Sequence, residues 1–215
     1  MQWGIKVASL STARGTKRKF DAVVTIEDPG LRNGLRFHRL PHPDHLVLRF
    51  EDVDDWSCDI AMAHRLHVDA ALRLARAHEG GSILVHCKAG VARSSAMALA
   101  LIADRMGPGR EMEAVLELLA VRPVAVPNLV VLDLADEALG RNGALKAAWM
   151  KVERASFRYA EHRRLKREML ARNPAMYSKP IPLELTATRF GSRTLKGVPG
   201  LESRDLDAER GPTPA

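Results

Sequence analysis

The sequence predicts an α/β fold: a central sheet flanked by helices, with a basic helical extension at the C-terminal end. Three observations lead to this prediction. Short apolar runs that suit buried strands alternate with longer segments whose apolar residues recur at helical spacing. The hydrophobic share of 46% is typical of a globular domain, and no apolar run reaches the roughly 20 residues that a membrane-spanning helix needs. Positive charge gathers late in the chain, after residue 140.

The strands and helices of the main domain follow from these runs and their boundaries. Asp59 can cap a helix, and Gly80-Gly81 can end it. The expected strands are residues 5–10, 20–27, 45–50 and the apolar run that ends at His86-Cys87. The expected helices are residues 60–78, 95–106, 111–121 and about 129–139.

The extension differs from the main domain in charge. Residues 1–140 carry 17 Lys and Arg against 18 Asp and Glu, whereas residues 141–215 carry 16 against 8. Residues 144–171 contain no Gly or Pro and predict one basic helix. Pro, Gly, Ser and Thr accumulate from Pro174 onward, which predicts a flexible tail. We therefore expect a compact domain over 1–143, a basic helical extension over 144–173 and a tail over 174–215.

The stretch from Ser82 to Ser95 reads as strand, tight loop and helix. Backbone N–H groups in such a loop can converge on one point and form a nest for an anion. The helix that starts near Arg93 adds its unpaired N–H groups and the positive end of its dipole. Cys87 lies at the start of this loop, and Arg93 can bind two oxygens of a phosphate group at once. The pattern predicts attack by the Cys87 thiolate on a bound phosphoryl group. The residues expected to bind that group are His86, Lys88, Ala89, Gly90, Val91, Ala92 and Arg93.

His86-Cys87-x5-Arg93-Ser94, with Ala89-Gly90 inside the loop, resembles the signature of the cysteine-dependent protein tyrosine and dual-specificity phosphatases. The resemblance covers roughly residues 5–140 and implies the phosphatase-type α/β fold and a phosphocysteine intermediate. It implies no metal ion and no cofactor. Ser95 favours the dual-specificity branch. A rhodanese-type sulfur carrier fits the loop length less well, and a buried strand Cys beside a helix-starting Arg is the alternative without function.

The resemblance also assigns further catalytic residues. The family supplies a general acid from a loop roughly thirty residues upstream, where Asp52, Asp54 and Asp55 stand together. Asp52 directly follows the third expected strand, so it is the first choice, with the other two left open. The resemblance gives Ser94 a hydrogen bond to the cysteine sulfur, although a helix N-cap role is an alternative. His86 is expected to orient the loop rather than to transfer protons.

The sequence thus predicts a phosphatase of phosphate monoesters, acting on phosphotyrosine and on phosphoserine or phosphothreonine in proteins. The alternatives are a phosphatase of non-protein substrates (a phosphoinositide, an inositol phosphate or an RNA 5′ end) and a phosphate-binding module without turnover. The basic helix suggests an acidic partner. A reactive thiol, two cysteines and no apparent secretory signal suggest a cytoplasmic location. If residues after 172 are a tail, their removal leaves activity on a small substrate intact.

Overall fold

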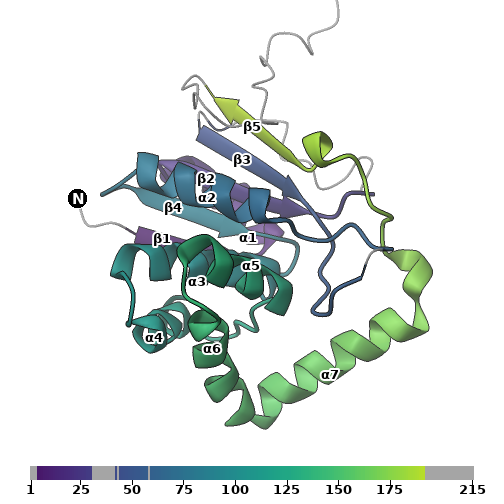
Figure 1. The fold of residues 1–215 in the computed structure, drawn as a ribbon. Coiled ribbons are helices and arrows are strands. Elements are labelled where there is room, and N and C mark those ends of the chain that lie inside the picture. Colours follow the sequence, from purple (N-terminus) through teal and green to yellow (C-terminus); the bar gives the residue numbers. More distant parts are fainter. Residues whose placement is uncertain (1–3, 31–41, 43, 58, 192–215) are drawn as a thin grey trace, which may run out of the picture.

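The computed structural model describes residues 4–30, 42, 44–57 and 59–191. These residues form a five-stranded sheet in the order β1-β4-β2-β3-β5 (Figure 1). The strands are β1 Gly4–Ala8, β2 Ala22–Glu27, β3 Asp44–Arg49, β4 Ser82–His86 and β5 Ala187–Gly191. β1 to β4 run parallel, and β5 runs antiparallel to β3. The mixed sheet with flanking helices confirms the predicted α/β class.

Parallel strands bring their carboxyl ends to one edge of the sheet. His86 at the end of β4 lies in register with Ala8 of β1 and Thr25 of β2, and Glu27 of β2 lies beside Arg49 of β3. The loops that leave these strands therefore meet at the same edge. In α/β sheets this edge is where ligands bind.

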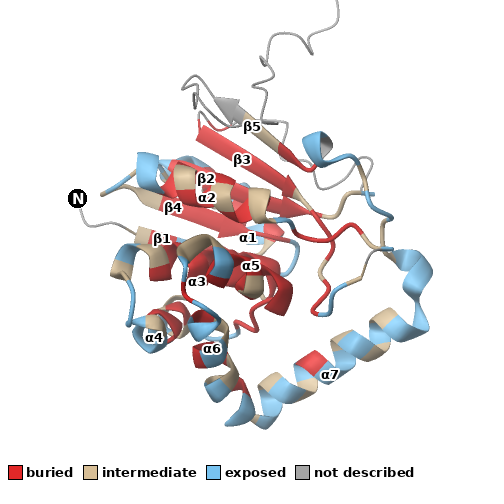
Figure 2. Ribbon diagram, in the orientation of Figure 1, coloured by how far each residue is buried: buried red, intermediate tan, exposed pale blue. Residues whose placement is uncertain are grey.

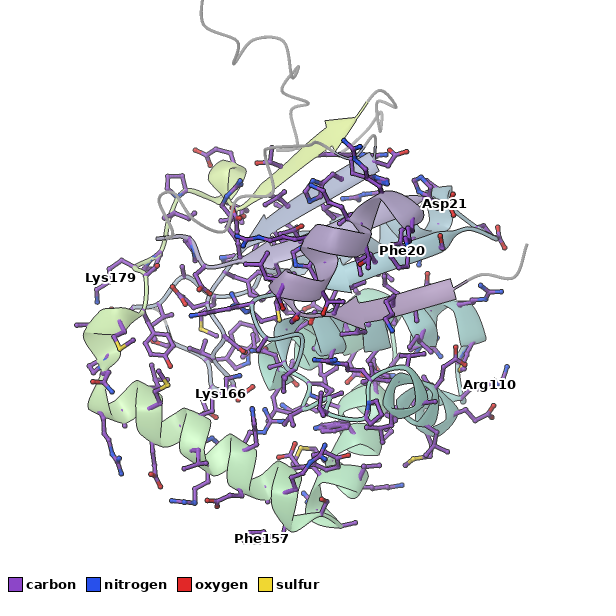
Figure 3. The ribbon with its side chains drawn as sticks, turned by 180° about the vertical axis from the view of Figure 1, so that it is seen from behind. Phe20, Asp21, Arg110, Phe157, Lys166 and Lys179 are labelled. Carbon is purple, nitrogen blue, oxygen red and sulfur yellow. The ribbon has the colours of Figure 1, made fainter. Side chains whose placement is uncertain are left out.

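Helices cover both faces of the sheet unequally. The short helix α1 Leu10–Thr16 covers one face over a small apolar cluster that includes Val23 and Leu84 (Figure 3). The next residues along the same strands, Val24 and Val85, point into the main core on the other face, as the two-residue period of a strand requires. The helices on that face are α2 Arg65–Ala77, α3 Arg93–Met106, α4 Glu111–Val121, α5 Leu129–Leu139 and α6 Ala144–Arg154 (Figures 1 and 2).

Two boundaries near the N-terminal half differ from the prediction. Residues 10–16 form α1, where Ser9 accepts a hydrogen bond from the Thr12 N–H as N-cap, so the first strand ends at Ala8. α2 begins at Arg65 rather than at residue 60, and His64 caps it instead of Asp59. The residues before α2 bond elsewhere, because the Ala61 carbonyl accepts from the Glu51 N–H at 2.7 Å.

The predicted helix over 144–171 is wrong in one respect, because it is two helices. α6 ends at Arg154, and α7 Phe157–Arg172 starts after the extended residue Ser156. α6 buries Trp149 in the core, whereas α7 runs as an outer arm from α6 toward the loop after β3 (Figure 1). Glu153 of α6 accepts hydrogen bonds from Trp149 and from Arg163 of α7. These bonds tie the two helices together where the chain turns.

The flexible tail predicted from residue 174 is wrong for residues 174–191. They form two 3-10 turns, Pro174–Met176 and Leu183–Leu185, and then β5. The Thr186 carbonyl accepts from the Arg49 N–H at 2.7 Å, so this segment enters the sheet beside β3. The rest of the predicted tail, 192–215, lies outside the described residues. Within the described chain, no helix is both long and apolar enough to cross a membrane.

Candidate active site

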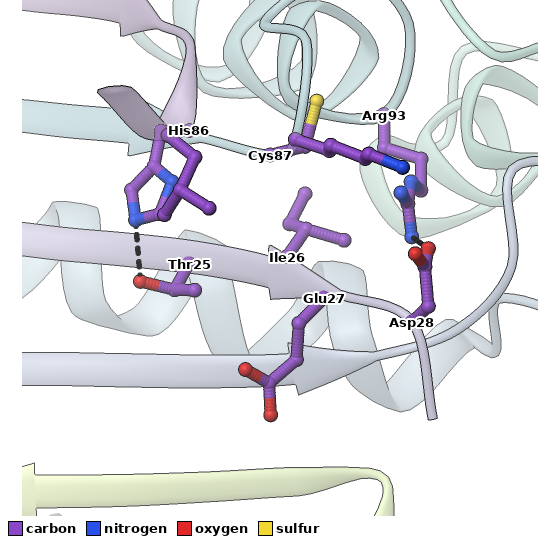
Figure 4. A pocket seen from close by; sticks show the side chains of 9 residues that line it. Thr25, Ile26, Glu27, Asp28, His86, Cys87 and Arg93 are labelled. Atoms are coloured by element: carbon purple, nitrogen blue, oxygen red, sulfur yellow. Dashed lines mark hydrogen bonds and ion pairs between the residues drawn. The ribbon is translucent and has the colours of Figure 1, made fainter. Parts of the chain in front are cut away.

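Cys87 directly follows β4 and is buried at the carboxyl edge of the sheet. Its Sγ lies 3.2 Å from Ser94 Oγ, and the Gly90 N–H donates to it at 3.3 Å. A small pocket opens beside it between the ends of β2 and β4, lined by Asp28 and Arg93 among others (Figure 4). The thiol therefore has two hydrogen-bonding neighbours from its own loop and an open side.

The loop after Cys87 turns its carbonyl groups outward. Each of five consecutive carbonyls accepts a hydrogen bond from outside the pocket. The pairs are Lys88 O with Leu10 N, Ala89 O and Gly90 O with the Arg122 guanidinium, Val91 O with Val126 N, and Ala92 O with Ala96 N and Asn128 N. In a trans peptide the N–H points opposite to the carbonyl, and no peptide bond of the described chain is cis. The N–H groups of residues 89–93 therefore face inward, as an anion nest requires.

Gly90 is needed for the loop to take this path. Its φ is +70°, and an added Cβ would lie 2.5 Å from the carbonyl carbon of Ala8. A side chain here would collide with the end of β1, because the Leu10 N–H nearby is bonded to the loop at Lys88. The glycine thus lets the loop approach the backbone of the neighbouring strand closely.

Arg93 is buried, and one end of its guanidinium is fixed. Nη1 donates to the Phe50 carbonyl at 2.6 Å and lies 2.6 Å from Asp28 Oδ1. Nε is buried and has no hydrogen-bond partner among the described residues. Burial lowers the pKa of Arg93, but the charges of Asp52, Asp28 and Cys87 raise it overall, so the guanidinium stays charged. The Nε edge is therefore left for the oxygens of a bound anion.

The His86 side chain points away from the nest and belongs to a row of hydrogen-bonded side chains across β4, β2 and β3. Its Nε2 lies 2.7 Å from Thr25 Oγ1, which lies 2.7 Å from His45 Nε2 (Figure 4). Burial lowers the pKa of His86 to about 4, with a smaller lowering by Lys17, while a backbone hydrogen bond at Cys87 opposes both. The ring is therefore neutral at pH 7. A role of His86 in orienting the loop stays a prediction.

The acidic loop after β3 pairs with α7. Asp52 Oδ1 accepts from Asn128 Nδ2 at 2.9 Å and from Lys166 Nζ at 2.5 Å. Burial raises the pKa of Asp52, but Lys166, Arg93 and these hydrogen bonds outweigh it and lower the value to about 2. About a third of the Asp52 side chain remains exposed. This carboxyl shares the electrostatic field of Arg93, so it lies close to the nest.

The other two candidate acids have partners of their own. Asp54 is buried, with Arg163 Nη1 2.7 Å from Oδ1 and Lys166 Nζ 2.9 Å from Oδ2. Asp55 is exposed and pairs with Arg167 at 2.9 Å. Asp54 is therefore bound like a structural carboxylate, whereas Asp55 lies at the surface.

The remaining cations of α7 also have partners within the chain. Arg158 donates to the Pro123 carbonyl, Arg164 pairs with Glu161 and Glu168, and Arg172 pairs with Glu168. An acidic partner outside the chain is thus not needed to balance α7.

The C-terminal segment also reaches the site, which the sequence did not reveal. The Ser178 N–H donates to Glu51 Oε1 at 2.9 Å, and its Oγ accepts from the Gly30 N–H at 3.0 Å. Burial and the charges of Asp52, Glu51, Asp28 and Asp54 raise the pKa of Tyr177. Tyr177 and Ser178 therefore lie next to the acidic loop. Lys88 is exposed, and the described residues contain no group of three His, Cys, Asp or Glu arranged for a metal ion.

Comparisons with known proteins give structural likeness only. No family model matches the chain, and no curated protein sequence matches it. A structure described as a mouse dual specificity phosphatase complexed with zinc tungstate is 21% identical, with a TM-score of 0.47, over 67% of this chain and 85% of that one. The human tyrosine phosphatase-like serine/threonine/tyrosine-interacting protein is 19% identical, with a TM-score of 0.48, over 62% and 89%.

PTPMT1 in complex with PI(5)P is 15% identical, with a TM-score of 0.44, over 67% of this chain and 93% of that one. The descriptions of the mouse and human proteins name the class that the Cys87 motif resembles. Because the identities are about 20% or lower and the TM-scores lie below 0.5, the functional argument rests on the geometry of the site itself.

Proposed function

We propose that this chain is a phosphatase that hydrolyses phosphate monoesters through a phosphocysteine intermediate. One observation carries the proposal. The loop after Cys87 turns five N–H groups inward, one of which bonds the sulfur, and Arg93, which lines the small pocket beside Cys87, has a buried Nε without a partner among the described residues. This arrangement offers donors for the three non-bridging oxygens of a phosphate beside a nucleophile. No other group in the described chain combines these features.

In the first step the Cys87 thiolate attacks phosphorus. The S–P bond forms while the bond from phosphorus to the ester oxygen breaks, and that oxygen leaves with the electron pair. Arg93 and the inward N–H groups of residues 89–93 hold the charge of the transferring group. The oxygen leaves as an alcohol if a carboxylic acid gives it a proton, a role that we assign to Asp52.

In the second step water attacks the phosphocysteine. Asp52, now a carboxylate, takes a proton from the water as its oxygen bonds to phosphorus. The S–P bond breaks, and the electron pair returns to the sulfur. Ser94 Oγ, 3.2 Å from Sγ, is placed to donate a hydrogen bond to the departing thiolate. The products are inorganic phosphate and the free enzyme.

The substrate class is a further part of the proposal. We infer phosphotyrosine in proteins as the main substrate, with phosphoserine and phosphothreonine as further protein substrates. The alternative is a non-protein phosphate monoester, and the exposed Lys88 beside the nest supports it through its charge. A reactive thiol favours a reducing, cytoplasmic location.

Replacing the nucleophile tests the proposal. Cys87→Ser is expected to abolish release of para-nitrophenol from para-nitrophenyl phosphate while inorganic phosphate still binds in calorimetry, because the nest stays intact. EDTA is expected to leave the parent rate unchanged, since Arg93 and backbone N–H groups supply the positive charge. Substantial turnover by Cys87→Ser would overturn the mechanism. Phosphate binding without any turnover by the parent protein would instead indicate a binding module.

A further inference from the structure

The contact between Lys166 and Asp52 joins α7 to the proposed general acid. The side chain of Lys166 lies on the inner side of α7 and is only 14% exposed (Figure 3). Its Nζ bridges two carboxylates, Asp52 Oδ1 at 2.5 Å and Asp54 Oδ2 at 2.9 Å. Asn128 Nδ2 adds a second N–H donor to the same oxygen of Asp52. Lys166 therefore lies between two acids as their shared cation.

This contact stabilises only one protonation state of Asp52. Both neighbours, Lys166 Nζ and Asn128 Nδ2, are donors, and a carboxylate accepts from both. Placing a proton on Asp52 would remove the negative charge that Lys166 binds. The geometry therefore opposes the acid form that a poor leaving group requires in the first step.

Leaving groups differ in how much they need that proton. A tyrosine phenol ionises near pH 10, so phenolate can depart with its electron pair and little proton transfer. The alkoxide of serine, of threonine or of an inositol ring is a far stronger base and leaves slowly unless it is protonated. An enzyme whose acid is held ionised thus discriminates between aryl and alkyl esters by chemistry rather than by pocket shape.

We propose that Lys166 is a specificity-determining residue that, by binding Asp52 as a carboxylate, lowers turnover of alkyl phosphates more than turnover of aryl phosphates such as phosphotyrosine. This inference rests on the proposed function and narrows its substrate class. Lys166 does not touch the substrate and acts through Asp52. With an aryl ester, the S–P bond forms as the phenol oxygen leaves with only partial proton transfer from Asp52, so the rate depends less on the acid form of Asp52 than it does with an alkyl ester.

The surroundings of Asp52 support this assignment. The pKa of Asp52 is lowered to about 2 although burial alone raises it. Besides Lys166, the charged or titratable groups that face Asp52 are Arg93 at the start of α3, His162 on α7, Tyr177 in the C-terminal segment and Asp54 in its own loop. Of these, Lys166 makes the direct ion pair, so its removal has the largest effect on the protonation of Asp52.

The test compares kcat/KM for an aryl and an alkyl ester in full-length variants. Lys166→Met keeps the apolar stem and removes the charge, whereas Lys166→Arg keeps the charge. Arg167→Met is the matched control, because Arg167 is the next residue on α7 and pairs with the exposed Asp55 of the same loop. The substrates are a phosphotyrosine peptide and the same peptide with phosphoserine.

Lys166→Met is expected to raise kcat/KM for the phosphoserine peptide about 10-fold or more, a part of the 10²–10⁴-fold that acid catalysis supplies. The phosphotyrosine rate is expected to change much less, and Lys166→Arg and Arg167→Met are expected to keep the parent selectivity. The gain should also extend to higher pH as the pKa of Asp52 rises. Adding Asp52→Asn to Lys166→Met should remove the gain, because the gain passes through that carboxyl.

Equal changes for both peptides, or a gain that survives Asp52→Asn, would overturn the role of Lys166. Thermal unfolding of each variant identifies a Lys166→Met protein that has lost its fold, and in that case Lys166→Gln replaces it. Failure of the proposed function would look different. It would show as no Cys87-dependent turnover of either peptide by the parent protein, before any variant is compared.

Discussion

Gly90 is the residue where the backbone of the nest and the end of β1 come closest. Gly90→Ala is expected to destabilise the protein by more than about 2 kcal/mol, from the left-handed backbone and from a Cβ placed 2.5 Å from Ala8. The phosphate affinity and the turnover of the Gly90→Ala variant should also fall. Gly140→Ala is the matched control, because Gly140 also has a positive φ, +64°, but open space around it. It should cost only about 1 kcal/mol, measured by urea unfolding. Equal losses for both variants would mean that the contact with Ala8 is unimportant.

At the residue scale, the sequence predicted which residues form the Cys87 loop. It did not predict the distant residues that bond to this loop. Cys87, Arg93 and Ser94 come together as their spacing indicates, because the loop is local in sequence. The partners of the loop come from distant segments: Asp28 on Arg93, and Arg122 on the Ala89 and Gly90 carbonyls. Each of these is an ordinary charged residue in its own segment. Only the tertiary fold brings them to the nest.

At the element scale, the segment after α7 braces the acidic loop. Ending the chain after residue 172 removes Ser178 from Glu51 and β5 from β3. We now expect this truncation to lower both stability and activity on para-nitrophenyl phosphate, contrary to the expectation for a flexible tail. A chain that ends after residue 191 keeps these contacts and serves as the control. Activity and melting temperature of the shorter chain equal to those of the control would show that the brace has no effect.

The same segment shows why some elements could not be predicted from the sequence. α7 has little apolar face, and what fixes it is a set of ion pairs, with Arg163 buried between Asp54 and Glu153. A basic sequence of this kind is typical of a solvated helix, and pairing to a loop over 100 residues earlier leaves no local pattern. β5 is short and follows Pro-containing turns, so it lacks the long apolar run of the central strands.

At the scale of the whole molecule, two buried histidines make stability depend on pH. Burial, with a smaller effect of His64, lowers the pKa of His67 to about 3, and burial, with a smaller effect of Lys17, lowers that of His86 to about 4. In the unfolded chain both protonate near pH 6.5. Between the folded and the unfolded pKa of each histidine, the unfolded state therefore binds more protons than the folded state. The free energy of unfolding falls as pH falls below about 6.5. Each histidine contributes up to about 1.4 kcal/mol per pH unit, until pH reaches its folded pKa.

Urea unfolding at pH 7, 6 and 5 measures the slope of the free energy of unfolding against pH. His67→Gln removes one titrating group and keeps an acceptor for the His64 N–H, so it should flatten the slope by about half. An unchanged slope in this variant would assign the effect to other groups. His67 is fully buried and stacked on Phe50, with ring centroids 5.0 Å apart.

The predicted α/β class and the first four strands are confirmed, and the three inner strands β2, β3 and β4 have the apolar runs that a buried parallel sheet requires. The sequence missed α1, the start of α2 and the late edge strand β5. These elements depend on caps and on pairing with distant segments rather than on their own periodicity.

The position of β5 has a consequence for how the protein is made. Ribosomes release a chain from its N-terminal end, and domains begin to fold in that order. β1 to β4, the Cys87 loop and its bracing Arg122 emerge well before Lys166, Ser178 and β5. During translation the pocket of the proposed nucleophile can thus assemble while the acidic loop still lacks its later partners. On the roles proposed for Cys87 and Lys166, the residues that carry the chemistry are therefore synthesised before the residue that sets selectivity.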